Sequence, residues 1–172
     1  VCGYQCTEEL VTSVPHLELE SATVSMRYLS LNGHVSYGGG GSDHGAGLSL
    51  ADSHADIKYS SVSHNIQHGI GAAAIFARRS VVDFAFSVIT HNQILGLGAA
   101  GIYAIDASTV NVTSSRIEYN QALAVTGSPE TNVETAVTVK RGAGIVCDFS
   151  NVSVADTYLT YNFGAPALVG TA

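Results

Sequence analysis

Two aspartates in the middle of the chain occupy places where carboxylates can act together. Asp56 and Asp83 each lie nine residues before an asparagine, Asn65 and Asn92, in two similar segments. If these segments form neighbouring stacked strands, the two carboxylates lie side by side in water, with Lys58 on the same face. Paired carboxylates serve general acid/base catalysis or bind calcium. Exposed aspartates are also common on strands without any catalytic role, so both interpretations stay open.

Two sequons suggest covalent modification. Asn111 is followed by Val112 and Thr113, and Asn151 is followed by Val152 and Ser153. Valines that are expected to face inward flank both asparagines, which places the asparagines on the outside, where a glycan is tolerated. We expect at least one of them to be glycosylated if the protein is secreted by a eukaryotic cell.

The three cysteines divide into two groups. Cys2 and Cys6 lie close together near the N-terminus, where they are candidates for a local disulfide or for pairing with another chain. Cys147 falls in an inward position, which favours a buried thiol that acts as a small apolar side chain. No second ligand pair follows at the spacing of a zinc site, and no HExxH or Ser/His/Asp pattern occurs. We therefore predict no metal site and no cofactor, with Ca²⁺ at Asp56 and Asp83 as the one exception to test.

A repeated segment positions these residues. It occurs four times, and three residues before each closing asparagine stands an aliphatic residue: Val62, Ile89, Ile117 and Leu159. Within each copy, apolar residues alternate with others, which is the period of a strand with one buried face. Three short strands in about 27 residues describe one coil of a parallel β-helix, and such coils must stack to bury their apolar faces.

The closing asparagines of the four copies are predicted to form a ladder. A side-chain amide turned inward at a corner can donate to, and accept from, the amides of the coils above and below. The predicted members are Asn65, Asn92, Asn120 and Asn162. A degenerate coil precedes them, in which Ala22, Val24, Leu29 and Asn32 have the same offsets.

The repeat resembles a known group of folds. The openings GAAAIF and GAAGIY, the middle pattern SxVxF or SxVxV, and the endings ITHN and IEYN resemble coils of right-handed parallel β-helix proteins. The nearest styles are the pectin-lyase-like superfamily and the polymorphic outer-membrane and autotransporter passengers. The resemblance covers about residues 15–170 and implies an all-β, right-handed parallel β-helix of five to six coils. Enzymatic members of the class carry clustered acidic residues on an outer sheet face, so it implies Asp56 and Asp83 as candidates for a polysaccharide lyase or hydrolase. The fold alone does not decide between these functions.

The domain organisation follows from where the repeat holds. Residues 1–14 are predicted to be an N-terminal cap or linker, and residues 15–172 the β-helix, with insertions at 33–44 and 121–141. After Asn162 the text GAPALVG begins another coil without a polar cap. This suggests either a truncated chain or a partner that continues the stack.

Composition excludes two classes of partner. Among 172 residues, 46% are apolar and 12% are charged, which is sufficient for a packed core. The net charge of −7, with only seven Lys and Arg, argues against nucleic acid. No run of 18 apolar residues occurs, so no membrane span is predicted.

One outward column is apolar and is a candidate contact surface. It consists of Ser49, Phe76, Tyr103 and Val146, which would form a vertical strip that stacks sugar rings or buries against another subunit. Together these features favour an extracellular or cell-surface structural module, a glycosylated subunit of a fibre that self-associates end to end. The alternative is a polysaccharide lyase or hydrolase, or a carbohydrate-binding adhesin of the pectin-lyase-like class.

Overall fold

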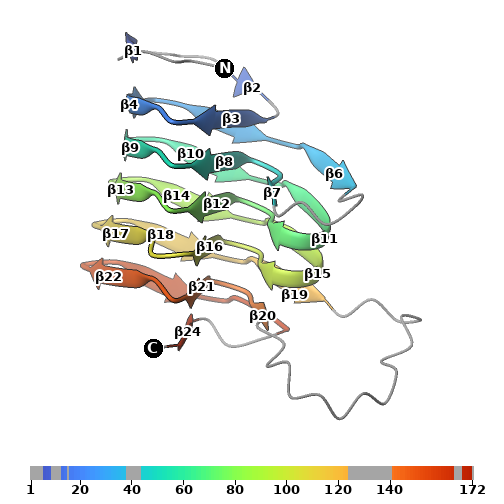
Figure 1. The fold of residues 1–172 in the computed structure, drawn as a ribbon. Helices are drawn as coiled ribbons and strands as arrows, with labels where there is room; N and C mark the ends of the chain where they lie inside the picture. Colours follow the sequence, from blue (N-terminus) through green and yellow to red (C-terminus); the bar gives the residue numbers. More distant parts are fainter. Residues whose placement is uncertain are drawn as a thin grey trace.

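The computed structural model is a parallel β-solenoid in which short strands stack along one axis (Figure 1). It describes residues 6–8, 13–14, 16–37, 44–123, 141–164 and 168–171, and within these ranges all regular structure is β. All of the strand pairs are parallel. The prediction of an all-β parallel β-helix is therefore confirmed.

Four sheets run along the solenoid. In stacking order, sheet A contains β1 (Cys6–Glu8), β4 (Thr23–Arg27), β9 (His54–Lys58), β13 (Val81–Ala85), β17 (Thr109–Thr113) and β22 (Asn151–Ala155). Sheet B contains β2 (Ser13–Val14), β5 (Ser30–Asn32), β10 (Ser61–Ser63), β14 (Val88–Thr90), β18 (Arg116–Glu118) and β23 (Tyr158–Thr160). Sheet C contains β3 (Leu17–Glu20), β8 (Leu48–Ala51), β12 (Ile75–Arg78), β16 (Ile102–Ile105), β21 (Ile145–Asp148) and β24 (Leu168–Thr171). Sheet D contains β6 (Val35–Tyr37), β11 (Ile66–Ala72), β15 (Gln93–Ala99) and β19 (Gln121–Leu123), with β7 (His44–Gly45) beside β11 and β20 (Arg141–Gly142) beside β15.

The coils that contain β5, β10, β14 and β18 thus have a fourth strand that the three-strand prediction did not include. The sequence of this strand is rich in glycine, which is typical of a turn between strands: it is IQHGIGA in β11 and QILGLGA in β15. The glycines let the strand bend while it keeps its pairing, since Gly71 and Gly98 have φ values of +138° and +114°. A Cβ at Gly98 would collide with the carbonyl oxygen of Gly71 in the coil before. The close stacking of sheet D therefore depends on glycine.

Inward side chains of sheets A, B and C form the main core. Equivalent positions stack on one another, as Val82 does on Val110 and Phe84 on Val112. These side chains are almost completely buried. Burial of each such side chain contributes about 1.5–3 kcal/mol relative to exposure. No coil closes this core alone, so the stack is the stable unit.

The corners of the coil are built from a repeated two-residue device. A residue in the left-handed region precedes a buried Ser, Thr or Asn, as in Asp52–Ser53 and Tyr59–Ser60, where φ is 50° and 53°. The buried hydroxyl accepts a hydrogen bond from the backbone N–H of the same position one coil earlier, as Ser80 Oγ does from Ser53 N at 3.0 Å. It also donates to the carbonyl two residues before it, 2.8 Å away at Arg78. Polar backbone groups at the bend are thereby satisfied inside the core.

The third corner carries the asparagine column. Asn65, Asn92 and Asn120 are fully buried, and each side-chain Nδ2 donates to the Oδ1 of the next asparagine at 3.0 Å, ending at Asn162. Each backbone N–H donates to the same Oδ1, at 3.0–3.1 Å. The structure thus places the four asparagines of the predicted ladder in one hydrogen-bonded column.

The register expected for the first coil is wrong by two residues. Asn32 pairs with Ser63 and is exposed, whereas His34 occupies the ladder position and donates its backbone N–H to Asn65 Oδ1 at 3.0 Å. A slip of two residues leaves the apolar side chains of Ala22, Val24 and Leu29 inward, because the strand period is two. Alternation of apolar residues therefore could not detect the error.

The two predicted insertions interrupt the same strand of their coils. Both fall within sheet D, where they separate β6 from β7 and β19 from β20 (Figure 1). In the N-terminal segment that was predicted to be a cap or linker, β1 and β2 pair with β4 and β5, so its described part stacks on the solenoid. Cys2 and the side chain of Cys6, the predicted disulfide, lie outside the described residues.

Candidate functional site

The two candidate carboxylates lie opposite each other on the outer face of sheet A. Asp56 on β9 and Asp83 on β13 are paired in register. Their neighbours along the strand, Ala55 and Phe84 among them, point into the core, which forces the aspartates outward. The strands thus bring together the two residues that the sequence selected.

Each carboxylate has partners of its own. Lys58 Nζ donates to Asp56 Oδ2 at 2.9 Å. Asp83 accepts from Asn111 Nδ2 at 2.7 Å through one oxygen and lies 3.1 Å from His54 Nε2 through the other. These side chains line a shallow hollow on sheet A. Asn111 lies nine residues before Asn120, the offset that also aligns Asp56 and Asp83, so the repeat places it beside Asp83. The sequence offered no sign that His54 joins this cluster, because its ring reaches Asp83 diagonally across two strands.

Electrostatics at Asp83 do not suit an acid catalyst. Partial burial acts to raise the pKa of this carboxyl, but the hydrogen bonds from Asn111 and His54 and the nearby charges of His54 and Lys58 outweigh it and lower the pKa. A general acid at neutral pH needs the opposite shift. Among the described residues, no group of three or more His, Cys, Asp or Glu side chains could hold a metal ion. The Lys58–Asp56 pair and the His54–Asp83 contact both lie on this outer face of sheet A.

The two sequon asparagines differ in their surroundings. Asn111 on β17 is half-buried, and its Nδ2, the atom that a glycan would modify, donates to Asp83. Asn151 on β22 is exposed and lies beside Thr109. The folded chain therefore has more room for a glycan at Asn151.

The apolar strip on sheet C is not an exposed surface, and this expectation is corrected. Phe76, Tyr103 and Val146 do share one column, but Phe76 is only 2% exposed and Val146 is 0% exposed. The C-terminal end of the sheet D strand folds over them, and Ala72 packs with Phe76 in a second small core. The unpredicted fourth strand is the cause of the error.

Acidic residues at the corner between sheets C and A are exposed. Arg79 donates two hydrogen bonds to the carboxylate of Asp52, at 2.7 and 2.6 Å. These hydrogen bonds, and then the charge of Arg79, hold the pKa of Asp52 below its usual value. The pair lies in water, so it contributes little to stability.

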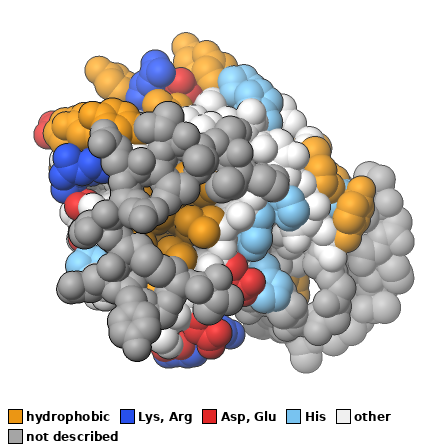
Figure 2. All heavy atoms as spheres, turned by 90° about the horizontal axis from the view of Figure 1, so that it is seen from above, with side chains coloured by type: hydrophobic (Ala, Val, Ile, Leu, Met, Phe, Trp, Pro, Cys, Tyr) orange, Lys and Arg blue, Asp and Glu red, His pale blue; other side chains and the backbone are white. Residues whose placement is uncertain are grey.

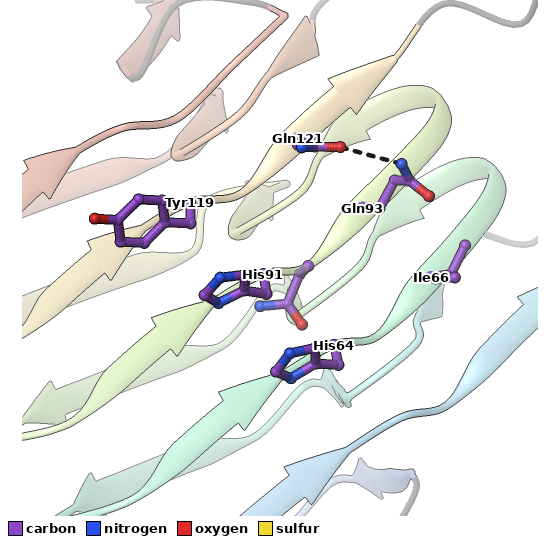
Figure 3. Close-up of a pocket in the computed structure, with 7 residues that line it drawn as sticks. His64, Ile66, His91, Gln93, Tyr119 and Gln121 are labelled. Atoms are coloured by element: carbon purple, nitrogen blue, oxygen red, sulfur yellow. Dashed lines mark hydrogen bonds between the residues drawn. The ribbon is translucent and has the colours of Figure 1, made fainter.

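Two columns of stacked rings stand at the corners on either side of sheet B. The column of His64, His91, Tyr119 and Tyr161 has ring centroids 5.0–5.2 Å apart. Figure 3 shows its first three rings on successive coils, beside a hollow that Gln93 and Gln121 also line, joined by a 3.2 Å hydrogen bond.

The second ring column was not predicted. Tyr28, Tyr59 and Phe86 stack at 5.6 and 5.3 Å, at the corner between sheets A and B. The available signal was the aromatic residue directly before Ser60 and Ser87. Each ring belongs to the left-handed corner residue, which aims its side chain out of the coil.

Histidines also stack near the N-terminal end. The rings of His16 and His34 lie 5.2 Å apart, and His68 stacks on Tyr37 at 4.6 Å. In the view along the solenoid from that end, several histidines gather on one side of the molecule (Figure 2). Burial, and then the charge of His16, lower the pKa of His34.

Comparison with known proteins adds no relative. No protein family, no curated protein and no solved structure matches the chain. The resemblance to the pectin-lyase-like superfamily is therefore limited to the parallel β-solenoid architecture. In the described part of the chain, no helix has the length and hydropathy to cross a membrane.

Proposed function

We propose that the chain is a structural β-helix module of an extracellular or cell-surface protein, and that copies associate head to tail into a fibre. The observation that supports this most is the continuity of the polar corners. At three of the four corners, side chains of one coil accept the backbone N–H groups of the coil before it, as at Ser80, Ser87 and Asn92. Such coils are equivalent building units, which suits a stiff rod.

The edge of the last described coil supports association along the axis. Within the described residues, β22 and β23 each pair with one strand only, so their other edges are open to a further strand. The side chains of Val152, Val154 and Leu159 pack on the core but remain partly exposed. A further coil would bury them, whether it came from a second copy or from the continuation of a longer chain.

The acidic face of sheet A also favours a structural role over catalysis. Asp56 and Asp83 are satisfied by Lys58, His54 and Asn111, and the lowered pKa of Asp83 keeps it ionised. Exposed ion pairs of this kind are common on strand surfaces. A glycan at Asn151 and membership of the pectin-lyase-like superfamily remain parts of the same proposal.

Electron microscopy and intact mass spectrometry of the purified native protein test the proposal. We expect fibres whose axial repeat is roughly 30 Å for about six coils at about 4.8 Å each. Discrete particles whose mass is that of a longer chain would show that further coils of the same chain cover the open edge. This result would refute the fibre proposal. Hexose-bearing peptides at Asn151 would support the glycoprotein.

An edge variant with a matched control separates stacking from nonspecific aggregation. Val154→Lys places a charge at an inward position of the open edge, which should abolish fibres. Ser153→Lys adds the same charge on the outward face of the same strand and should leave fibres intact. Cleavage of acidic polysaccharides by the parent protein, lost in Asp56→Asn and Asp83→Asn, would instead establish the enzyme.

A further inference from the structure

One of the two ring columns is interrupted. At the corner between sheets A and B, the positions that follow Phe86 are Ser114 and Asp156 in the next two coils, as the hydrogen bonds from Phe86 N to Thr113 O and from Ser114 N to Ala155 O show. Both residues keep the left-handed conformation, with φ of 48° and 49°. The corner conformation of the backbone therefore continues into these two coils, whereas the stack of aromatic rings ends at Phe86.

The interruption leaves a ring-sized space above Phe86. Tyr59 stacks on one face of Phe86 at 5.3 Å, and no described ring covers the other face. Phe86 is 52% exposed and lines a hollow of about 410 Å³. Coils are about 4.8 Å apart, so a serine in place of a ring leaves the thickness of one flat ring between Phe86 and Asp156. The second column has rings at His91, Tyr119 and Tyr161 and has no such gap.

Polar groups surround this space at its edges. Arg116 on β18, Asp156 and the hydroxyl of Ser114 line the hollow together with Tyr158. The side chain of Arg116 is 57% exposed, and its Nη1 forms a salt bridge of 3.7 Å with Glu118 Oε1. It is therefore available to a ligand, as is the carboxylate of Asp156 on an exposed corner.

We propose that this gap is a binding subsite for one pyranose ring of an oligosaccharide. A pyranose presents C–H bonds on its face, which can pack on the uncovered face of Phe86, and hydroxyls around its edge, which can accept from Arg116 and donate to Asp156. An aromatic side chain of another protein fits the gap less well, because it would cover Arg116 and Asp156 without offering either of them a hydrogen bond. The subsite goes beyond the proposed structural role and does not depend on it.

The direct test is titration of the full chain with soluble oligosaccharides, followed by amide NMR and calorimetry. Cellohexaose, mannohexaose and hexagalacturonate are suitable probes. A single open subsite should bind at least one of them with a Kd of about 1 mM, with shifts at Phe86, Ser114 and Arg116. No binding of any probe at about ten times that concentration would overturn the proposal.

Two variants locate the site independently of folding defects. Ser114→Tyr completes the column with the chain's own ring at a backbone conformation that Tyr59 already adopts, so it should abolish binding without loss of stability. Phe86→Ala should weaken binding at least tenfold, whereas Phe86→Tyr should retain it. The control His91→Tyr changes the uninterrupted column and should leave binding unchanged.

Several outcomes would contradict the assignment. Undiminished binding by the Ser114→Tyr variant would place the sugar elsewhere on the molecule. Shifts centred on His91 or Tyr119 would assign it to the other ring column. Binding of indole at the gap, with no binding of any sugar, would show that the gap takes an aromatic group.

Discussion

The asparagine column should make one buried amide disproportionately important. Asn92 is fully buried, and its side chain takes part in five hydrogen bonds. Its Oδ1 accepts from the backbone N–H and from Nδ2 of Asn65, and its Nδ2 donates to Val62 O, Thr90 O and Asn120 Oδ1. The substitution Asn92→Ala removes all five at once. The backbone N–H and the side-chain Nδ2 of Asn65 are affected differently by this loss.

The magnitude follows from which groups lose their last partner. Asn65 Nδ2 keeps a hydrogen bond to Leu31 O at 3.3 Å, and Asn120 Oδ1 still accepts from the backbone N–H of Asn92. The backbone N–H of Asn65 loses the one acceptor it has. An orphaned buried donor costs about 1–3 kcal/mol, and a typical lost hydrogen bond about 1 kcal/mol. We therefore expect Asn92→Ala to lower the free energy of unfolding by about 3 kcal/mol.

Urea unfolding followed by far-UV circular dichroism measures this loss, with Asn32→Ala as the matched control. Asn32 is the exposed asparagine that the sequence alone aligned with the ladder, and its replacement should cost less than about 0.5 kcal/mol. Hydrogen exchange at the Asn65 amide should also accelerate in Asn92→Ala. Equal effects of the two substitutions would refute both the register and the energetic argument.

Three further expectations follow from burial, backbone geometry and charge. Phe76→Ala should lower the free energy of unfolding by about 3 kcal/mol, because this ring is 2% exposed. If urea unfolding shows almost no loss of stability, the ring lies on the surface and the burial described above is wrong. Gly98→Ala should cost more than Gly33→Ala in the same assay, since both glycines have positive φ but only at Gly98 would a Cβ meet backbone. Asp83 has a lowered pKa in the folded state, so its stabilising contribution is complete above the ordinary aspartate pKa of about 3.9 and is lost as the pH falls below it. Asp83→Asn should therefore flatten the stability profile between about pH 5 and 3, by less than about 1 kcal/mol because the side chain is 41% exposed. An unchanged slope would contradict this.

The repeat allowed the solenoid to be predicted because its positions carry unambiguous chemistry. A buried serine or asparagine at a corner is tolerated only when a neighbouring coil satisfies it, so its recurrence marks the coil. Asp56 and Asp83 could be aligned for the same reason, since the register is fixed by Asn65 and Asn92. The sequence therefore predicted where each residue of the repeat lies within its coil.

The sequence did not show which segments cover the outer face of a strand. Alternation distinguishes two faces, but Phe76 lies on the outward face of sheet C and is still buried, because β11 returns over it. Because β11 is rich in glycine, its sequence was interpreted as a bend and not as a strand. The contact of Asp83 with His54, and the gap above Phe86, depend on cross-coil neighbours that a single repeat does not specify.

The hydrogen bonds of the corners also give the rod a polarity. The side-chain amides of Asn65, Asn92 and Asn120 each donate to the Oδ1 of the asparagine in the next coil, besides donating back to a carbonyl of the coil before. The backbone N–H groups at Ser53, Ser60 and Ser80 donate forward to the hydroxyl of the next coil in the same way. At these corner positions the forward end of the solenoid therefore presents backbone N–H donors and the other end presents side-chain oxygen acceptors, so a reversed molecule would set donors against donors there. A mixed population of copies would sort by orientation without any dedicated recognition surface. If copies stack as proposed, all of them would point the same way along the fibre.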